Sequence, residues 1–221
     1  MIPIAAGGTV ADRPAEMVVF IVLLAVLPAA LVLLTSFLKM AVVLSIARSA
    51  LGAPQVPPNT AVTGLALVLT ILVMAPMARR TADLLASQPR GVTLEARLGA
   101  LDRASGPLRE FLGRFARPDD RAAFLDVARR LAPSGPTPEE TDLAVLAPAF
   151  VVSELRRAFT IGFLVFLPFL VVDLVVGNAL LALGLTQVSP TSVALPLKLL
   201  LFVAVDGWKV LARALALSYA A

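Results

Sequence analysis

Apolar residues occur in long runs separated by short breaks and one charged segment. Residues 17–38 form 22 consecutive uncharged and mostly apolar positions. A helix of this length spans about 33 Å, enough to cross a hydrocarbon core. Lys39 interrupts the pattern, which then continues to Ala47. The preceding segment, 1–16, lacks the basic start of a cleaved signal peptide.

A glycine- and proline-rich break separates this run from a second one. The break covers residues 52–58, and Asn59 is the predicted N-cap of the apolar run 60–78. Residues 17–78 therefore predict a first apolar helical hairpin.

Residues 79–142 form a hydrophilic insert, which holds 21 of the 34 charged residues. Apolar positions recur at helical spacing in three short stretches. These positions are Leu94, Leu98 and Leu101; Leu108, Phe111, Leu112 and Phe115; and Phe124, Ala128 and Leu131. Near the end of the insert, Thr137, Pro138 and Glu140 have the pattern of an N-cap, a first-turn proline and a capping-box acid. This pattern predicts that a long helix starts there.

Residues 143–221 predict a second hairpin whose apolar runs carry charges. Before the turn at 185–190 the uninterrupted runs are 143–153, 158–172 and 174–183, separated by charged residues, and 191–217 contains four charged side chains. The fold class is therefore all-α, with four apolar helical segments in membrane-associated hairpins around a small helical insert. Pro168 and Pro196 fit either kinks or tolerated membrane-helix prolines.

Composition supports a membrane protein and narrows the chemistry. The 221 residues are 59% hydrophobic and 15% charged, with a net charge of +4 and a mean hydropathy of +0.91. There is no Cys or His, which excludes thiolate and imidazole sites but leaves carboxylate-only sites open. We expect no catalytic residue, cofactor or metal. We also expect no nucleic-acid partner, because the sequence has no basic stripe with interleaved aromatic residues.

Five charged residues in the apolar halves are expected to face protein or water, because a charge at a bilayer centre costs about 2.5–3.5 kcal/mol on insertion scales. They are Lys39, Glu154, Asp173, Lys198 and Asp206. Lys198 and Asp206 lie about 12 Å apart along one helix and cannot pair directly, whereas Asp206 and Lys209 can. Snorkelling is the alternative for Lys39 and Lys209.

Several stretches of the two hairpins form a recognisable set of motifs. In the first hairpin they are TSFLKMAVVLS (35–45), ALG (50–52), QVPPN (55–59), GLAL (64–67) and VMAP (73–76). In the second they are LAPAFVVSEL (146–155), IGFL (161–164), LPFL (167–170), DLVV (173–176), SPT (189–191), LPLKL (195–199) and DGW (206–208). In order, spacing and residue type these motifs resemble one family, the export-gate proteins called FliP in flagella and SctR in injectisomes; the insert is unmatched. Lys39, where the flagellar branch usually has Arg, and Ser189-Pro190 favour the injectisome branch.

The resemblance implies a conical pore in the bacterial inner membrane. Five copies would assemble with two small helical partner proteins to pass unfolded substrates, and the insert would lie on the periplasmic side. The family seals this pore with three methionines after Ala-Leu-Gly. Here Ala182-Leu183-Gly184 precedes Leu185, Thr186 and Gln187, so these three are the predicted constriction near 184–190. The alternative is a simple hairpin turn capped by Gly184.

Lys198 has no partner within reach on its own helix, so we expect an inter-subunit ion pair with Glu154 or Asp173, which align with charged positions of the family. Breaking a buried pair is costly, so Lys198→Glu should prevent assembly. Trp208 and Tyr219 fit either membrane-interface anchors or inter-subunit contacts. Two rival functions remain open at this point. One is a small four-helix transporter or channel, and the other is an intramembrane enzyme that uses Asp173 and Asp206 as a carboxylate pair.

Overall fold

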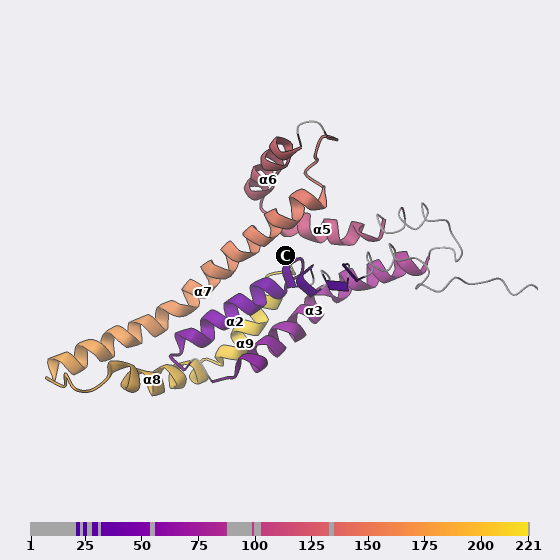
Figure 1. Cartoon of the computed structure of the whole chain (residues 1–221). Helices are drawn as coiled ribbons and strands as arrows, with labels where there is room; N and C mark the ends of the chain where they lie inside the picture. The colour runs from indigo at the N-terminus through magenta and orange to yellow at the C-terminus, as the bar shows by residue number, and fades with distance from the viewer. Residues whose placement is uncertain are drawn as a thin grey trace, which may run out of the picture.

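One long helix organises the molecule. The computed structural model describes residues 21–22, 24–25, 28–30, 32–53, 56–87, 99, 103–132 and 135–220. Helix α7 (Leu143–Ala182) has 40 residues, about 60 Å at 1.5 Å per residue. It runs diagonally through Figure 1 as the spine against which other helices pack. The predicted all-α class is confirmed across the described residues.

The first hairpin packs on the middle of this spine. Helix α2 (Phe37–Ala50) contacts α7 on one side and α3 (Asn59–Ala86) on the other. The core face of α2 consists of Met40, Val43, Leu44 and Ala47, all with no exposed surface. Gly162 of α7 lets α2 approach closely, because a Cβ there would lie 2.4 Å from Cδ1 of Ile46.

The insert covers the N-terminal half of α7. Helix α5 (Gly106–Phe115) and helix α6 (Pro118–Leu131) each carry a proline in their first turn and contact α7. The apolar stretches 108–115 and 124–131 form α5 and α6 as predicted. Leu94, Leu98 and Leu101 lie outside the described residues. Leu131 is 80% exposed, so it is not part of the core.

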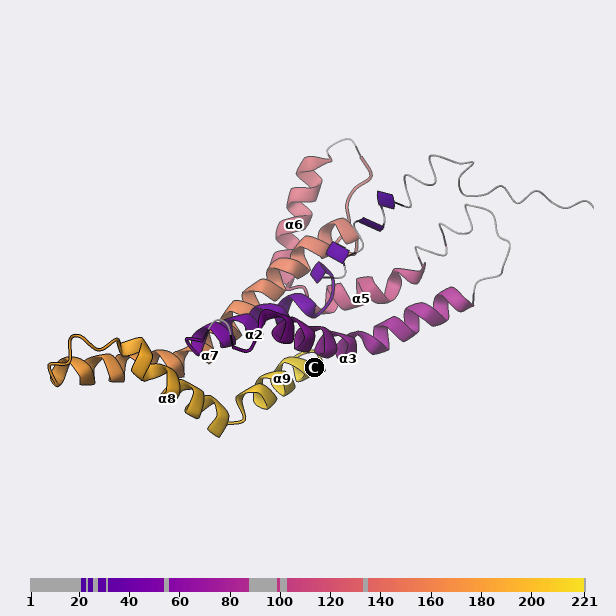
Figure 2. The same cartoon turned by 60° about the horizontal axis from the view of Figure 1, so that its bottom comes forward.

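The chain turns back at the far end of α7. Helix α8 (Pro190–Ala204) returns along α7, and α9 (Gly207–Leu217) leaves it to contact α3. Figure 2 shows the sharp turn between α8 and α9. The single helical segment predicted over 191–217 is therefore wrong, because Asp206 has a left-handed backbone with φ of 54°. Gly207 makes room there for the Phe202 ring, which a Cβ would meet at 2.2 Å.

Three helix boundaries also differ from the predictions. Among the described residues, the first run bends at 34–36, so Lys39 lies in the first turn of α2. Asn59 is the first residue of α3 and not its cap, since the Pro58 carbonyl accepts from the amides of Ala61 and Val62. Helix α3 continues past residue 78 to Ala86.

The start of α7 lies five residues beyond the predicted first helical position. Its N-cap position is Asp142, and Leu143 is the first helical residue. The Asp142 side chain accepts a 2.8 Å hydrogen bond from the Glu139 amide. This local bond stabilises a turn in place of the helical start that Thr137 and Pro138 predicted.

Candidate functional site

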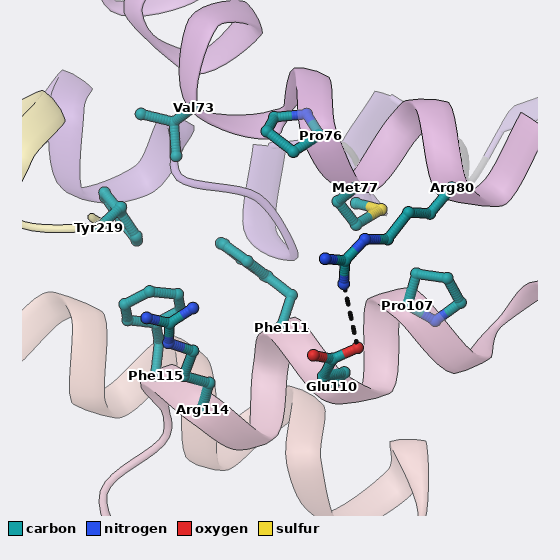
Figure 3. A pocket seen from close by; sticks show the side chains of 10 residues that line it. All are labelled: Val73, Pro76, Met77, Arg80, Pro107, Glu110, Phe111, Arg114, Phe115 and Tyr219. Atoms are coloured by element: carbon teal, nitrogen blue, oxygen red, sulfur yellow. Dashed lines mark ion pairs between the residues drawn. The ribbon is translucent and has the colours of Figure 1, made fainter. Parts of the chain in front are cut away.

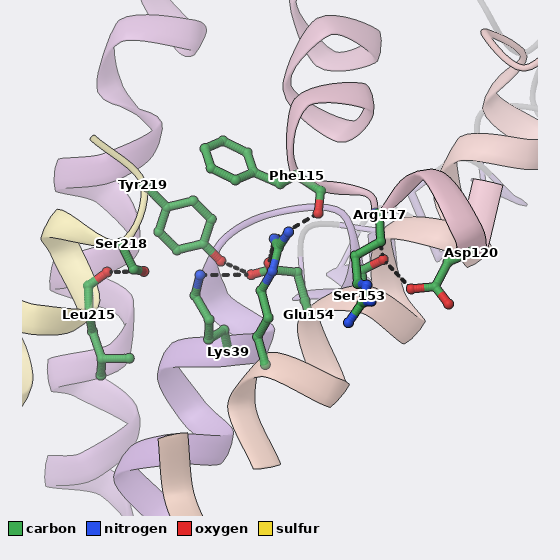
Figure 4. Close-up of polar contacts among 10 residues, drawn as sticks. Lys39, Phe115, Arg117, Asp120, Ser153, Glu154, Leu215, Ser218 and Tyr219 are labelled. Atoms are coloured by element: carbon green, nitrogen blue, oxygen red, sulfur yellow. Dashed lines mark hydrogen bonds and ion pairs between the residues drawn. The ribbon is translucent and has the colours of Figure 1, made fainter. Parts of the chain in front are cut away.

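A buried ion pair joins the first hairpin to the spine. Glu154 of α7 and Lys39 of α2 are both almost fully buried, with 3.3 Å between Lys39 Nζ and Glu154 Oε2. The hydroxyl of Tyr219, close to the C-terminal end, donates to the same oxygen, as Figure 4 shows. Residues far apart in the sequence therefore meet at one carboxylate.

Arg157 occupies the other oxygen of Glu154. Its guanidinium lies 2.9 Å from Oε1 and also donates to the carbonyl of Phe115, the last residue of α5, at 2.7 Å. Both carboxylate oxygens thus have cationic or hydroxyl partners, which is what a buried charge requires. We call Lys39, Glu154, Arg157 and Tyr219 the polar cluster.

Aromatic rings enclose the tyrosine of this cluster. Tyr219 stacks on Phe111 at 5.9 Å between ring centroids and meets Phe115 edge-on at 4.8 Å. Lys39 Nζ lies 3.6 Å from the centroid of the Tyr219 ring, a cation–π contact. Burial, together with the adjacent Glu154 charge, raises the pKa of Tyr219, so its hydroxyl stays protonated and remains a donor.

Figure 3 shows the same aromatic rings with Val73, Pro76 and Met77 of α3 above them. Arg80 of α3 and Glu110 of α5 pair at 3.6 Å across this opening, and both are about two-thirds exposed.

The contacts of Tyr219 with Glu154, Lys39, Phe111 and Phe115 correct the prediction made for this residue. Tyr219 makes intrachain contacts that hold the C-terminal end against α2, α5 and α7.

A second buried group anchors α6 and was not found from the sequence. Ser153 donates to Asp120 Oδ2 at 2.7 Å and accepts from the Arg117 amide at 2.9 Å. Arg156 approaches the other oxygen of Asp120 at 3.4 Å. Asp120 lies in a segment rich in charged residues, so no pattern distinguished it from exposed acids.

Lys198 and Asp173 form a separate pair between α8 and α7. Their Nζ and Oδ2 atoms lie 2.6 Å apart, and Lys198 is buried. Asp173, one of the two carboxylates predicted for Lys198, is its partner, and here the pair lies within one chain. Glu154, the other predicted partner, pairs with Lys39 and Arg157.

Asp206 is not buried and pairs with Lys209 at 3.6 Å, as its i, i+3 spacing predicted. Asp173 and Asp206, the two acids of the enzyme hypothesis, thus each pair with a lysine of the chain. Trp208 packs edge-on against Phe202 at 5.1 Å between ring centroids, an intrachain contact that neither of its predicted roles included.

The predicted constriction residues lie at the tip of the α7–α8 hairpin. Residues 181–193 are all exposed, and Leu185, Thr186 and Gln187 lie at the outer end of the loop. Gly184 has a φ of +70°. Its amide donates to the Leu181 carbonyl at 3.0 Å, and the Leu185 amide donates to that of Leu180 at 2.9 Å. This pair of bonds is the Schellman motif that ends a helix at glycine.

Comparison with known proteins places the chain in a family. The sequence profile of the FliP family matches residues 20–215. The chain belongs to the FliP family.

Named relatives of this family come from both secretion and flagellar systems. The hypersensitivity response secretion protein HrcR of Ralstonia nicotianae is 43% identical over 93% of this chain and 97% of the relative. The Yop proteins translocation protein R of Yersinia pestis is 44% identical over 92% and 95%. The flagellar biosynthetic protein FliP of Pectobacterium carotovorum is 44% identical over 98% and 83%. The export-gate interpretation made from the motifs is confirmed, and the chain is a component of a membrane-bound protein-export apparatus.

A membrane-bound assembly of the FliP family explains the exposed apolar surface of α3 and α7. Helices α3 and α7 are long and apolar enough to cross a membrane, yet little of either apolar stretch is buried within this chain. Exposed side chains include Val68, Ile71 and Leu72 of α3, and Phe159, Phe163, Leu164, Leu174 and Val175 of α7. A continuous surface of this kind needs lipid or other subunits to cover it.

Proposed function

We propose that this chain is one pore-forming subunit of a type III export gate in the bacterial inner membrane, and that the α7–α8 tip forms its constriction. The observation that carries this proposal is the exposure of residues 181–193 at this tip. Leu181, Leu183 and Leu185 are 67%, 71% and 45% exposed in a loop held by a Schellman turn. Apolar side chains presented on a rigid turn are suited to meet equivalent side chains of neighbouring copies.

The chemistry of the tip predicts how it would seal. Repeated by rotational symmetry, Leu185 would supply an apolar ring, while Thr186 and Gln187 would add groups that hydrate or hydrogen-bond. Three methionines would give a more deformable closure, because their side chains are unbranched and flexible. We therefore expect a narrower seal that depends in part on hydrogen bonds.

The assembly would contain five copies together with two smaller helical partner proteins, and it would pass unfolded substrate proteins. The apolar faces of α3, α7 and α8 would be shared between neighbouring subunits and lipid. The hydrophilic insert would project on the periplasmic side. The mass of the intact purified complex tests this stoichiometry, and a chain that purified alone as a folded monomer would contradict it.

Cysteine cross-linking tests the constriction, because the chain has no cysteine of its own. Leu185→Cys should give a disulfide-linked dimer on mild oxidation of the assembled complex, since symmetry brings equivalent tips together. Leu131→Cys is the matched control, an exposed leucine on α6, and should stay monomeric. Equal cross-linking of both variants, or none at residue 185, would refute the assignment of the tip.

A further inference from the structure

A basic pocket lies beside the polar cluster, between the insert and α7. Its accessible volume is about 520 Å³, within the range of ligand pockets. The described residues that line it include five cationic side chains and no acidic one. The cations are Lys39, Arg114, Arg117, Arg156 and Arg157.

The inner wall of this pocket is short of negative charge. Lys39 and Arg157 share the single carboxylate of Glu154, whose oxygens are both occupied. Arg156 reaches Asp120 only at 3.4 Å, and the Ser153 hydroxyl lies closer to that carboxylate. Arg117 lies 3.5 Å from Asp119. The five cations therefore face three carboxylates, those of Glu154, Asp120 and Asp119, and net positive charge remains beside an open cavity, where an anion would gain charge-assisted hydrogen bonds.

The outer wall of the pocket is apolar and continues along α7. Ile161 and Phe115 line the pocket. Leu164, one turn beyond Ile161 on the same helix face, is 60% exposed, and Phe163 is 61% exposed. Arg156 and Arg157 therefore directly precede the apolar, exposed stretch of α7, whose uncharged residues run from 158 to 172.

We propose that this pocket binds the phosphate headgroup of an anionic phospholipid, with its acyl chains along the exposed face of α7. Basic pockets at the edge of membrane-spanning helices are suited to such headgroups. A free phosphate has the same charge chemistry but would not use the apolar wall. The inference goes beyond the export function, and it does not depend on which residues close the pore.

Lipid titration of the full chain, in the oligomer in which it purifies, tests the proposal. The thermal midpoint would be followed against short-chain phosphatidylglycerol, short-chain phosphatidylcholine and inorganic phosphate. We expect phosphatidylglycerol to reach half of its stabilising effect at a concentration at least about tenfold lower than either of the others, because only it supplies both charge and acyl chains. Equal concentrations for the two lipids would overturn the proposal, and an equal effect of phosphate would show a free-anion site.

Paired variants locate the site. Arg117→Gln with Arg156→Gln should raise the half-saturating phosphatidylglycerol concentration about 25-fold, at about fivefold per cation near a headgroup. Arg129→Gln with Arg130→Gln removes the same charge from α6, outside the pocket lining, and should leave that concentration within about twofold. If both double variants lost the same affinity for phosphatidylglycerol, the binding would depend on general surface charge and not on the pocket.

The midpoint without lipid separates misfolding from lost binding. A pocket variant with an unchanged lipid-free midpoint and a weakened lipid response supports the proposal. A wild-type chain with no response to phosphatidylglycerol, together with a pocket variant that no longer forms the oligomer, would overturn it. That result would assign the pocket to an acidic group of a neighbouring subunit.

Discussion

The two halves of α7 differ in how their charged and apolar side chains are covered. The N-terminal half carries Glu154, Arg156 and Arg157, and it is covered by α2, α5 and α6 of its own chain. The C-terminal half carries one charge, Asp173, which pairs with Lys198 of α8. Most of its large apolar side chains are exposed, Phe169 and Val176 being the buried ones. The first half is therefore covered more fully by its own chain, although Phe159 is exposed, whereas the second half relies more on lipid or further copies.

Glu154→Gln should produce the largest loss of stability. It would leave Lys39 and Arg157 buried beside a neutral amide, and removing one partner of a buried pair costs about 3–5 kcal/mol. Thermal or denaturant unfolding of the purified chain would measure the change. Glu110→Gln is the matched control, because its pair with Arg80 is exposed and worth about 0–1 kcal/mol. Similar losses in both variants would show that the polar cluster is not the centre of stability.

Lys198→Glu should lower the stability of the chain less than Glu154→Gln does, but it should loosen the α7–α8 hairpin more. Two carboxylates would replace the 2.6 Å pair with Asp173, and the partial exposure of Asp173 limits the cost to about 1–3 kcal/mol. The yield of assembled complex, measured by size-exclusion chromatography, should fall because α8 no longer holds its place on α7.

Co-expression of the single variants Asp173→Lys and Lys198→Asp distinguishes an intrachain pair from one between subunits. As a control, the swap with both changes in the same chain should recover most of the yield that either single variant loses. If two chains, each with one substitution, complemented each other when co-expressed, the pair would form across subunits.

The apolar pattern was sufficient to predict most helices but not the partners of the charges. Helical spacing at 108–115 and 124–131 gave α5 and α6, and the motifs gave the family. By contrast, the sequence allows several ion pairs among the charged residues Lys39, Glu154, Asp173 and Lys198. The pairs that form depend on tertiary contacts, which the sequence pattern does not give. In the folded chain, Lys39 lies beside Glu154 and Lys198 beside Asp173.

Local features also overrode two strong sequence signals. The capping pattern at Thr137 and Pro138 was sound by itself, but the Asp142 side chain binds the Glu139 amide and delays the helix. The turn at Asp206 lies inside an apolar stretch that hydropathy treats as continuous. The constriction residues Leu185, Thr186 and Gln187 rest on the resemblance, and their role remains a prediction that the cross-linking experiment tests.

Two glycines of α7 give the most direct test of the contrast between its halves. Gly162→Ala should destabilise the chain by about 1–3 kcal/mol, because its Cβ would clash with Ile46 of α2. Gly177→Ala has no atom within 4 Å to meet and should stabilise the helix by up to about 1 kcal/mol, since alanine favours helix over glycine. Thermal unfolding of the two variants should therefore move the midpoint in opposite directions.

The same two variants also report on the assembly. If Gly177 faces a neighbouring copy, the alanine should lower the yield of complex while the stability of the isolated chain rises. Gly162→Ala should instead lower both together, because its clash lies within one chain. Parallel changes in yield and stability at both positions would mean that the C-terminal half of α7 is no more dependent on partners than the N-terminal half.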